Sequence, residues 1–229
     1  TIEVRSPDTG TTTFTYDEAG NVATRTDAKG QVISYTYDAL NRPVLVSSSV
    51  AGEPDIQYGY DAPTAAYGIG RLTSVDDGNG IRTFDYTPEG WLAAETWTVS
   101  GQVLTTSYQY DGAGLIEQIT YPSGRVVVYG RNAAGEVSSV STAHGGTTTS
   151  LAAQVERAPF GPVTAMLHGN GLAETRTLDL NYRTTAITVP GVHSLSYSYT
   201  ADSNIADISD LLTPSLSQSL TYDAVDRLA

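Results

Sequence analysis

A short motif recurs throughout the chain, and this repetition constrains the fold more than any other feature. The motif reads aromatic-x-Tyr-Asp-x-x-Gly, followed by a polar and an aliphatic residue, as in residues 14–22. Ten copies are in register, with the aspartate or its substitute at positions 17, 38, 61, 87, 111, 132, 158, 179, 200 and 223. Successive positions lie 21 to 26 residues apart. We therefore expect residues 1–229 to form a single array of about ten structural repeats.

Each copy of the motif predicts a strand, a tight turn and a second strand. Aromatic residues two positions apart, such as Tyr35 and Tyr37, point to the same face of a strand. An aspartate at the strand end can accept a hydrogen bond from the backbone two residues later, and a glycine three residues later can take a positive φ. Together they predict a type I turn that closes on a left-handed residue. Asn41 is a suitable substitute for that glycine.

A second set of turns, which includes residues 27–30 and 168–171, falls between the motifs and predicts strands of about 6–9 residues. Tyr182, Ser203 and Asp226 occupy the glycine position of late copies, where we expect altered turns. The motif residues that we expect to build the hairpins are Tyr16, Asp17, Gly20, Tyr37, Asp38, Asn41, Tyr60, Asp61, Tyr86, Gly90, Tyr110, Asp111, Gly114, Gly135, Gly161, Asp179, Tyr199, Tyr222 and Asp223.

The composition excludes several classes of protein. The chain has 12 basic and 25 acidic residues, a formal net charge of −13, which argues against a nucleic-acid partner. No apolar run approaches the roughly 18 residues of a membrane-spanning helix, so we expect no membrane insertion. Cysteine is absent, which removes disulfides and thiolate chemistry. The chain opens on Thr1 without a methionine and stops within a repeat at Ala229, so we expect a segment truncated at both ends.

No residue pattern predicts catalysis, a cofactor or a metal. His144, His168 and His193 are expected in surface loops, without a second histidine or a fixed carboxylate partner that would indicate zinc. Residues 76–80, Asp-Asp-Gly-Asn-Gly, resemble part of a calcium loop, but a hairpin turn explains them without an ion. The Tyr–Asp pairs recur in every repeat, whereas a catalytic acid–base pair would occur once. We therefore expect no enzyme.

Trp91 and Trp97 are the two tryptophans of the chain, six residues apart. In one strand they would share a face. They could stack on a sugar ring, but packing between repeats is the favoured interpretation, because large aromatic side chains usually supply buried area.

The Tyr-Asp-x-x-Gly/Asn-Arg/Asn units resemble the YD repeats of the RHS family, over about residues 10–229. Residues 160–163, 169–171, 175–179 and 182–183 look especially like that family's repeat core. The resemblance implies an all-β fold, a spiral antiparallel sheet of hairpins that makes an open section of a shell. In bacterial polymorphic and insecticidal toxin-complex proteins such shells enclose a toxin polypeptide, and in teneurins a similar barrel belongs to an adhesion receptor. The Asp-Pro motif of the self-cleaving members is absent, so we expect no self-cleavage here.

The sequence therefore predicts a non-catalytic shell segment of a secreted or cell-surface bacterial protein, with an enclosed or adjacent polypeptide of the same parent protein as its partner. The alternative is an extracellular adhesion or carbohydrate-binding module that uses exposed aromatic side chains.

Overall fold

A computed structural model describes residues 2–159 and 161–229 of the chain. Strands account for nearly all of the regular structure, and most of them are 5 to 11 residues long. They are β1 (Ile2–Ser6), β2 (Gly10–Tyr16), β3 (Val22–Thr26), β4 (Val32–Tyr37), β5 (Pro43–Ser48), β6 (Ile56–Tyr60), β7 (Leu72–Asp76), β8 (Gly80–Tyr86), β9 (Leu92–Val99), β10 (Gln102–Tyr110), β11 (Ile116–Thr120), β12 (Val126–Arg131), β13 (Val137–His144), β14 (Thr147–Arg157), β15 (Val163–His168), β16 (Ala173–Leu178), β17 (Thr184–Val189), β18 (His193–Tyr199), β19 (Ile205–Asp210) and β20 (Gln218–Ser219). One 3₁₀ helix, η1 (Pro214–Leu216), precedes β20.

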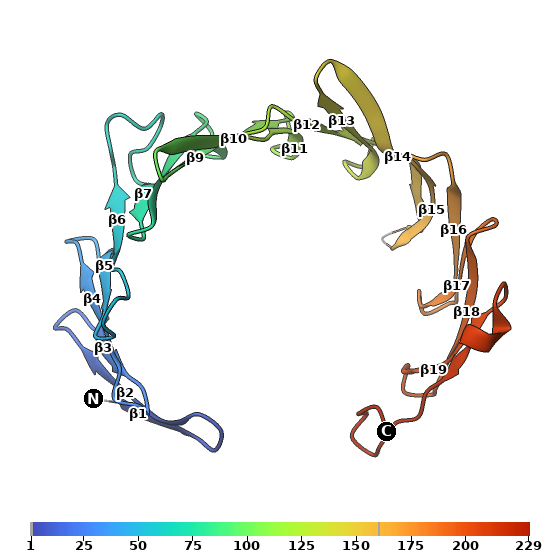
Figure 1. The fold of residues 1–229 in the computed structure, drawn as a ribbon, viewed down its shortest axis with the longest axis horizontal. Coiled ribbons are helices and arrows are strands. Elements are labelled where there is room, and N and C mark those ends of the chain that lie inside the picture. The colour runs from blue at the N-terminus through green and yellow to red at the C-terminus, as the bar shows by residue number, and fades with distance from the viewer. Residues whose placement is uncertain (1, 160) are drawn as a thin grey trace. The chain divides into compact units, whose positions relative to one another are not determined.

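The backbone forms two compact units. Unit 1 comprises residues 1–109 and 120–123, and unit 2 comprises residues 110–119 and 124–229. In unit 1 the strands from β1 to β10 pair antiparallel, each with the next in the chain. In unit 2 the strands from β12 to β20 do the same (Figure 1). The expected all-β fold of antiparallel hairpins is confirmed.

Apart from the third copy, the motif turns share the backbone hydrogen bonds that the sequence predicts. At the second copy the backbone N–H of Asp38 donates to the carbonyl of Arg42 at 2.9 Å, and the N–H of Asn41 donates to the carbonyl of Asp38 at 3.0 Å. Asn41 is left-handed, with φ of 60°. The Asp38 carboxylate accepts from the N–H groups of Leu40 and Arg42 at 2.8 and 2.9 Å. The aspartate side chain thus fixes the turn from inside.

The expectation of altered turns in the late copies is wrong. Tyr182, Ser203 and Asp226 have φ of 63°, 70° and 59°, the same left-handed conformation as the glycines. Their N–H groups donate to the carbonyls of Asp179, Thr200 and Asp223 at 3.0 to 3.1 Å, as in the other turns. A side chain in this conformation costs about 1 kcal/mol. The hydrogen bonds of the turn and the pairing of its strands therefore outweigh the local preference of the residue.

The register sorts side chains onto two unlike faces, since directly opposed residues share a face. In unit 1 an aromatic face carries Phe14, Tyr35, Tyr58, Phe84 and Trp97. The opposite, hydroxyl face carries rows of threonine and serine that oppose one another across the strands: Thr15, Thr24 and Ser34 in one row, and Thr83, Thr96 and Thr105 in another. Some of these hydroxyls bond to each other, as Thr15 and Thr24 do at 2.6 Å.

Neither unit has a conventional hydrophobic core. Among the described residues Val189 is the one apolar residue classed as buried, at 3% exposed, and no large side chain is fully buried. In the described part of each unit, the strands contact their neighbours in the chain and no other strand. Most aromatic side chains are half-buried, and Tyr16, Tyr67, Tyr121 and Tyr182 are exposed, so the buried apolar area per residue is low. Interactions between successive repeats must therefore supply stability that a second layer supplies in other folds.

Candidate functional site

The residues that follow the motif aspartate by four positions connect one repeat to the next. Arg42 donates from Nε to the Asp38 carboxylate of its own turn and from Nη2 to the Asp61 carboxylate of the next turn, both at 2.7 Å. Its guanidinium also lies 4.3 Å from the centre of the Tyr60 ring. Arg42 thus contacts both the tyrosine and the aspartate of the following repeat. We call this chain of contacts along the motif turns the repeat ladder.

The repeat ladder recurs in unit 2. Arg183 donates to Asp179 at 2.7 Å and to the Ser203 hydroxyl at 3.0 Å, and lies 4.6 Å from the Tyr199 ring. Asparagine replaces arginine in other copies and reaches the next turn through a neutral amide donor. Asn204 donates to Asp226 at 2.8 Å, and in unit 1 Asn21 donates to Asp17 and to Asn41 at 3.1 and 2.9 Å.

The motif tyrosine forms a second link between repeats in five copies. Its hydroxyl donates to a backbone carbonyl at the start of the second strand of the preceding motif hairpin. These pairs are Tyr37 with Val22 at 2.9 Å, Tyr60 with Pro43 at 3.0 Å, Tyr86 with Leu72 at 2.6 Å, Tyr199 with Thr184 at 2.6 Å and Tyr222 with Ile205 at 3.0 Å.

Arg131 occupies the tyrosine position of its motif and forms the same link to the preceding repeat. Its Nη2 donates to the carbonyl of Ile116 at 2.9 Å, and Ile116 follows Asp111 as Val22 follows Asp17. Its Nη1 donates to the carbonyl of Gly135 in its own turn at 2.9 Å. A guanidinium is long enough and has enough donors to replace the phenol hydroxyl.

The ladder shifts the pKa of its ionisable groups. The backbone N–H of Arg42 is the main cause that lowers the pKa of Asp38, and the Arg42 side chain is the main cause for Asp61. The two carboxylates raise the pKa of Arg42 in return, Asp61 more than Asp38. Burial raises the pKa of Tyr60. Each shift favours the ionised carboxylates, the guanidinium and the neutral phenol that the ladder requires.

The remaining motif residues lie in equivalent places. Gly20, Gly90, Gly114 and Gly135 close their turns with φ of 79° to 93°. Gly161 donates to the carbonyl of Ala158 at 2.9 Å, while its neighbour Phe160, part of the quoted family stretch, lies outside the described residues. The Asp223 carboxylate accepts from Arg227 at 2.7 Å. Tyr16 ends β2, and Tyr110 ends β10 beside the turn of Asp111.

The third copy of the motif carries an insertion, but its aspartate, Asp61, still forms the hydrogen bonds that close the turn. The N–H of Asp61 donates to the carbonyl of Arg71 at 3.1 Å, and the N–H of Gly70 donates to the Asp61 carboxylate at 2.5 Å. Residues 62–69 loop out between them. The turn of this copy is therefore longer than the others.

The tryptophans do not share a strand. Trp97 belongs to β9, whereas Trp91 precedes it as the closing residue of the Thr87 turn, whose N–H donates to the Trp91 carbonyl at 2.8 Å. A β-bulge at Tyr86 shifts the register there. The even spacing between Trp91 and Trp97 therefore does not place the two side chains on one face of a strand. Both rings are half-buried, and the Arg82 guanidinium lies 5.2 Å from the centre of the Trp97 ring. Stacking on a sugar stays a prediction.

The histidines lie at strand ends rather than in loops, and one has the carboxylate partner that we did not expect. His144 ends β13, His168 ends β15 and His193 begins β18. Glu174, 8% exposed, lies 3.0 Å from Nε2 of His168 and accepts from Arg176 at 2.6 Å. Burial alone would raise the pKa of Glu174, but the bonds from Arg176 and His168 outweigh it and lower the pKa.

This pair could have been found from the sequence. His168 and Glu174 flank the turn that contains Gly169 and Gly171, so they lie on the same face of one hairpin. Among the described residues, no three histidine, aspartate or glutamate side chains gather as a metal site would require. None of the described residues belongs to a helix long and apolar enough to cross a membrane.

Residues 76–80 form a turn between β7 and β8. The Asp77 carboxylate accepts from the N–H groups of Asn79 and Gly80 at 2.9 and 3.1 Å, and Gly78 has φ of 75°. The carboxylate is therefore engaged by its own backbone, as a hairpin turn requires.

Hairpins connected turn to turn by a repeat ladder define a class of β-repeat protein, and comparison with known proteins specifies it. The family model Teneurin YD-shell matches residues 8–224, so the chain belongs to the Teneurin YD-shell family. A search among curated protein sequences found no match.

Solved structures share the fold. The crystal structure of TcdB2-TccC3-Cdc42 has a TM-score of 0.88 at 16% identity, over 99% of this chain and 13% of that chain. TcdB2-TccC3 without its hypervariable C-terminal region has a TM-score of 0.89 at 15% identity, with the same coverage. The Tc holotoxin pore of Photorhabdus luminescens has 0.87 at 16% identity, over 98% and 13%. This chain therefore spans about an eighth of the length of these structures.

The hydroxyl of Tyr60 should stabilise the fold. Tyr60→Phe leaves the carbonyl of Pro43 without its partner, and we expect the free energy of unfolding in urea to fall by about 1 kcal/mol. Tyr58→Phe is the matched control, because Tyr58 shares the strand and the face but its hydroxyl bonds to no other described residue. Equal losses in the two variants would contradict the role of the hydroxyl.

Acid should weaken the ladder. The pKa of Asp61 is lower in the folded chain than its ordinary value of 3.8, so the unfolded chain binds more protons near that pH. We expect the free energy of unfolding to fall as the pH drops from about 5 to about 3, and to fall less in Asp61→Asn. Asp55→Asn, at an exposed aspartate without a bond to another described residue, is the control. If Asp61→Asn follows the wild-type curve, the ion pair with Arg42 contributes nothing.

Proposed function

We infer that this chain is a non-catalytic wall segment of a β-sheet shell, which encloses or presents another polypeptide, a toxin cargo, in a secreted or surface-displayed bacterial protein of RHS type. The observation that carries the proposal is the repeat ladder in sheets that lack a core. Arg42 and Tyr60 contact the neighbouring repeat by contacts that Arg183 and Tyr199 repeat in unit 2.

Such an arrangement suits a wall. Stability that depends on nearest neighbours lets a sheet extend by adding repeats without a growing core. Both faces then stay available, one of them aromatic. A single-layer sheet encloses a given volume with fewer residues than a two-layered wall, because no residues form a second layer.

The relatives support the same role. Membership in the Teneurin YD-shell family supports a shell. The TcdB2-TccC3 structures of the same fold are known with Cdc42 and without a hypervariable C-terminal region. The carboxylates and tyrosines with shifted pKa values in this chain belong mostly to the repeated turns, which supports a structural task for them rather than catalysis.

Protease protection in the complete protein that contains this segment tests the proposal. We expect the enclosed polypeptide to resist limited proteolysis while the shell is native, and to be cleaved in the double variant Arg42→Glu, Tyr60→Ala, which breaks two links of the ladder. Arg5→Glu, at a side chain that is 80% exposed, is the control and should leave the protection intact.

The readout is mass spectrometry of the fragments over time. A polypeptide that is digested in the native wild-type protein as fast as in isolation would exclude enclosure.

A further inference from the structure

The loop inserted in the third copy of the motif lies against the hydroxyl face of unit 1. Two hydrogen bonds fix its backbone to the next repeat. The N–H of Ala66 donates to Oδ1 of Asp85 at 2.8 Å, and the N–H of Tyr86 donates to the carbonyl of Ala66 at 3.0 Å. Gly68 is buried, and a Cβ added there would lie 2.7 Å from Cγ2 of Thr73. The loop is therefore packed closely on the sheet.

A cavity of about 320 Å³ lies between this loop and the strands β7 and β8. From the sheet it is lined by Ser74 and Thr83, which oppose each other across the two strands, and by Asp85. Three residues line it from the loop: Ala62, Thr64 and Ala65. We call it the insertion cavity. It is a hollow on the hydroxyl face that the inserted loop walls on one side.

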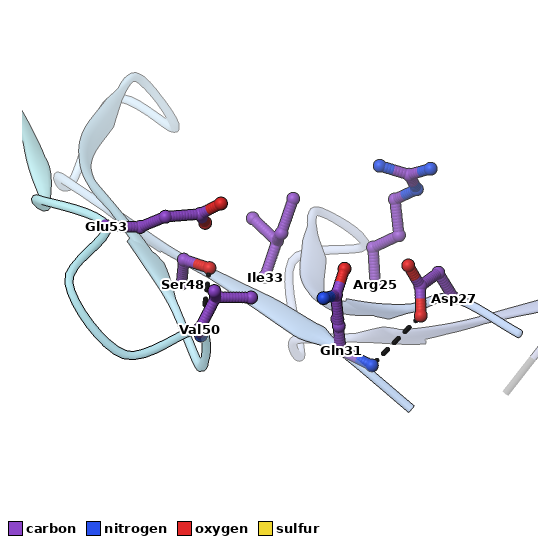
Figure 2. A pocket seen from close by; sticks show the side chains of 7 residues that line it. All are labelled: Arg25, Asp27, Gln31, Ile33, Ser48, Val50 and Glu53. Carbon is purple, nitrogen blue, oxygen red and sulfur yellow. Dashed lines mark hydrogen bonds between the residues drawn. The ribbon is translucent and has the colours of Figure 1, made fainter. Parts of the chain in front are cut away.

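The insertion cavity carries charge of one sign. Asp85 is half-buried, and its Oδ2 bonds to no other described residue. In the part of the chain that the structure describes, no arginine or lysine lines the cavity, and Arg71, which follows the loop, donates to backbone carbonyls of the loop. The pocket at the ends of β3, β4 and β5 differs, since Figure 2 shows Arg25 there beside Asp27. A carboxylate partly withdrawn from water without a counter-ion favours a cationic ligand.

The other polar side chains of the cavity are neutral hydroxyls. Those of Thr64, Ser74 and Thr83 bond to no other described residue, so each can accept a hydrogen bond. A primary ammonium has three donors and no acceptor, which matches one carboxylate oxygen and such hydroxyls. The methyl groups of Ala62 and Ala65 belong to the same lining and can contact the aliphatic stem that carries an ammonium.

Two other kinds of cation match the cavity less well. A guanidinium pairs best with both oxygens of a carboxylate, but Oδ1 of Asp85 already accepts from the N–H of Ala66. A divalent metal ion requires a shell of several oxygen ligands. Among the described residues, no three carboxylate or histidine side chains gather to supply one.

We propose that the insertion cavity binds a primary ammonium group on an aliphatic stem, paired with Oδ2 of Asp85 and bonded to the hydroxyls of Ser74 and Thr83. A lysine side chain of a polypeptide and a free diamine both carry this group. The site does not depend on the proposed function, since it needs neither a complete shell nor an enclosed polypeptide.

NMR titration of the isotope-labelled 229-residue chain tests the proposal, with the amide of Ala66 as the reporter because it donates to Asp85. The probes are Nα-acetyl-lysine methylamide for a peptide lysine and cadaverine for a free diamine. Matched probes carry arginine or norleucine in place of lysine. We expect the lysine probe to shift the Ala66 resonance, the arginine probe to bind more weakly, and the norleucine probe to leave the resonance unchanged.

Three variants locate the site. Asp85→Asn keeps an acceptor for Ala66 but removes the charge, and should raise the dissociation constant about tenfold, as loss of a charged hydrogen bond does. Thr83→Val removes one hydroxyl without changing the bond that fixes the loop, and should weaken binding about threefold. Asp76→Asn is the matched control, because Asp76 lies two residues after Ser74 on the same face of β7 but outside the lining, and it should leave the affinity unchanged.

Four results would overturn the proposal: no shift at Ala66 with either amine, equal affinity for the lysine and norleucine probes, equal affinity for the lysine and arginine probes, or equal losses in Asp85→Asn and Asp76→Asn. Binding by either amine supports the site and distinguishes the source. A response to the lysine probe alone identifies a polypeptide as the ligand, and a response to cadaverine alone identifies a free diamine.

Discussion

No second layer covers the strands in the part of the chain that the structure describes, and this constraint determines how the fold must be stabilised. A sheet that buries one apolar residue among those described cannot draw its stability from a core. The chain instead places a small polar cluster at each motif turn and connects it to the next. Arg42 is an example. Its side chain bonds to Asp38 in its own turn and contacts both Asp61 and the Tyr60 ring of the next repeat.

The second edge of the sheet is held differently. There the turns approach each other through small residues: a Cβ added at Gly10 would lie 2.7 Å from that of Ala28, and one added at Gly78 would lie 2.4 Å from that of Pro54. Close approach of backbone needs glycine at these points. One edge is thus held by charged and hydroxyl groups, and the other by this close approach of the backbone.

The repeat made the hairpins, the turn type and their order predictable, because Asp and Gly at fixed spacing determine local geometry. Residues that act across repeats were not predictable from the same pattern. Tyr182 occupies a left-handed position that its own preference disfavours, since strand pairing on both sides fixes the backbone. The bulge at Tyr86 removes Trp91 from the strand of Trp97. By contrast, Glu174 and His168 could have been paired from the sequence, because they flank one expected hairpin turn. The repeated Arg/Asn position was visible, but its link to the next repeat requires the register between strands.

Hydrogen exchange in Arg42→Ala, followed amide by amide, tests the central claim most directly, because it measures where stability is lost. If the ladder stabilises neighbours, protection should fall in β4 to β7, on either side of the removed link, and stay as in the wild type in β16 to β19 of unit 2. Equal loss of protection in all strands would show that a shared core holds the chain, and unchanged protection in β4 to β7 would show that the ladder contributes nothing.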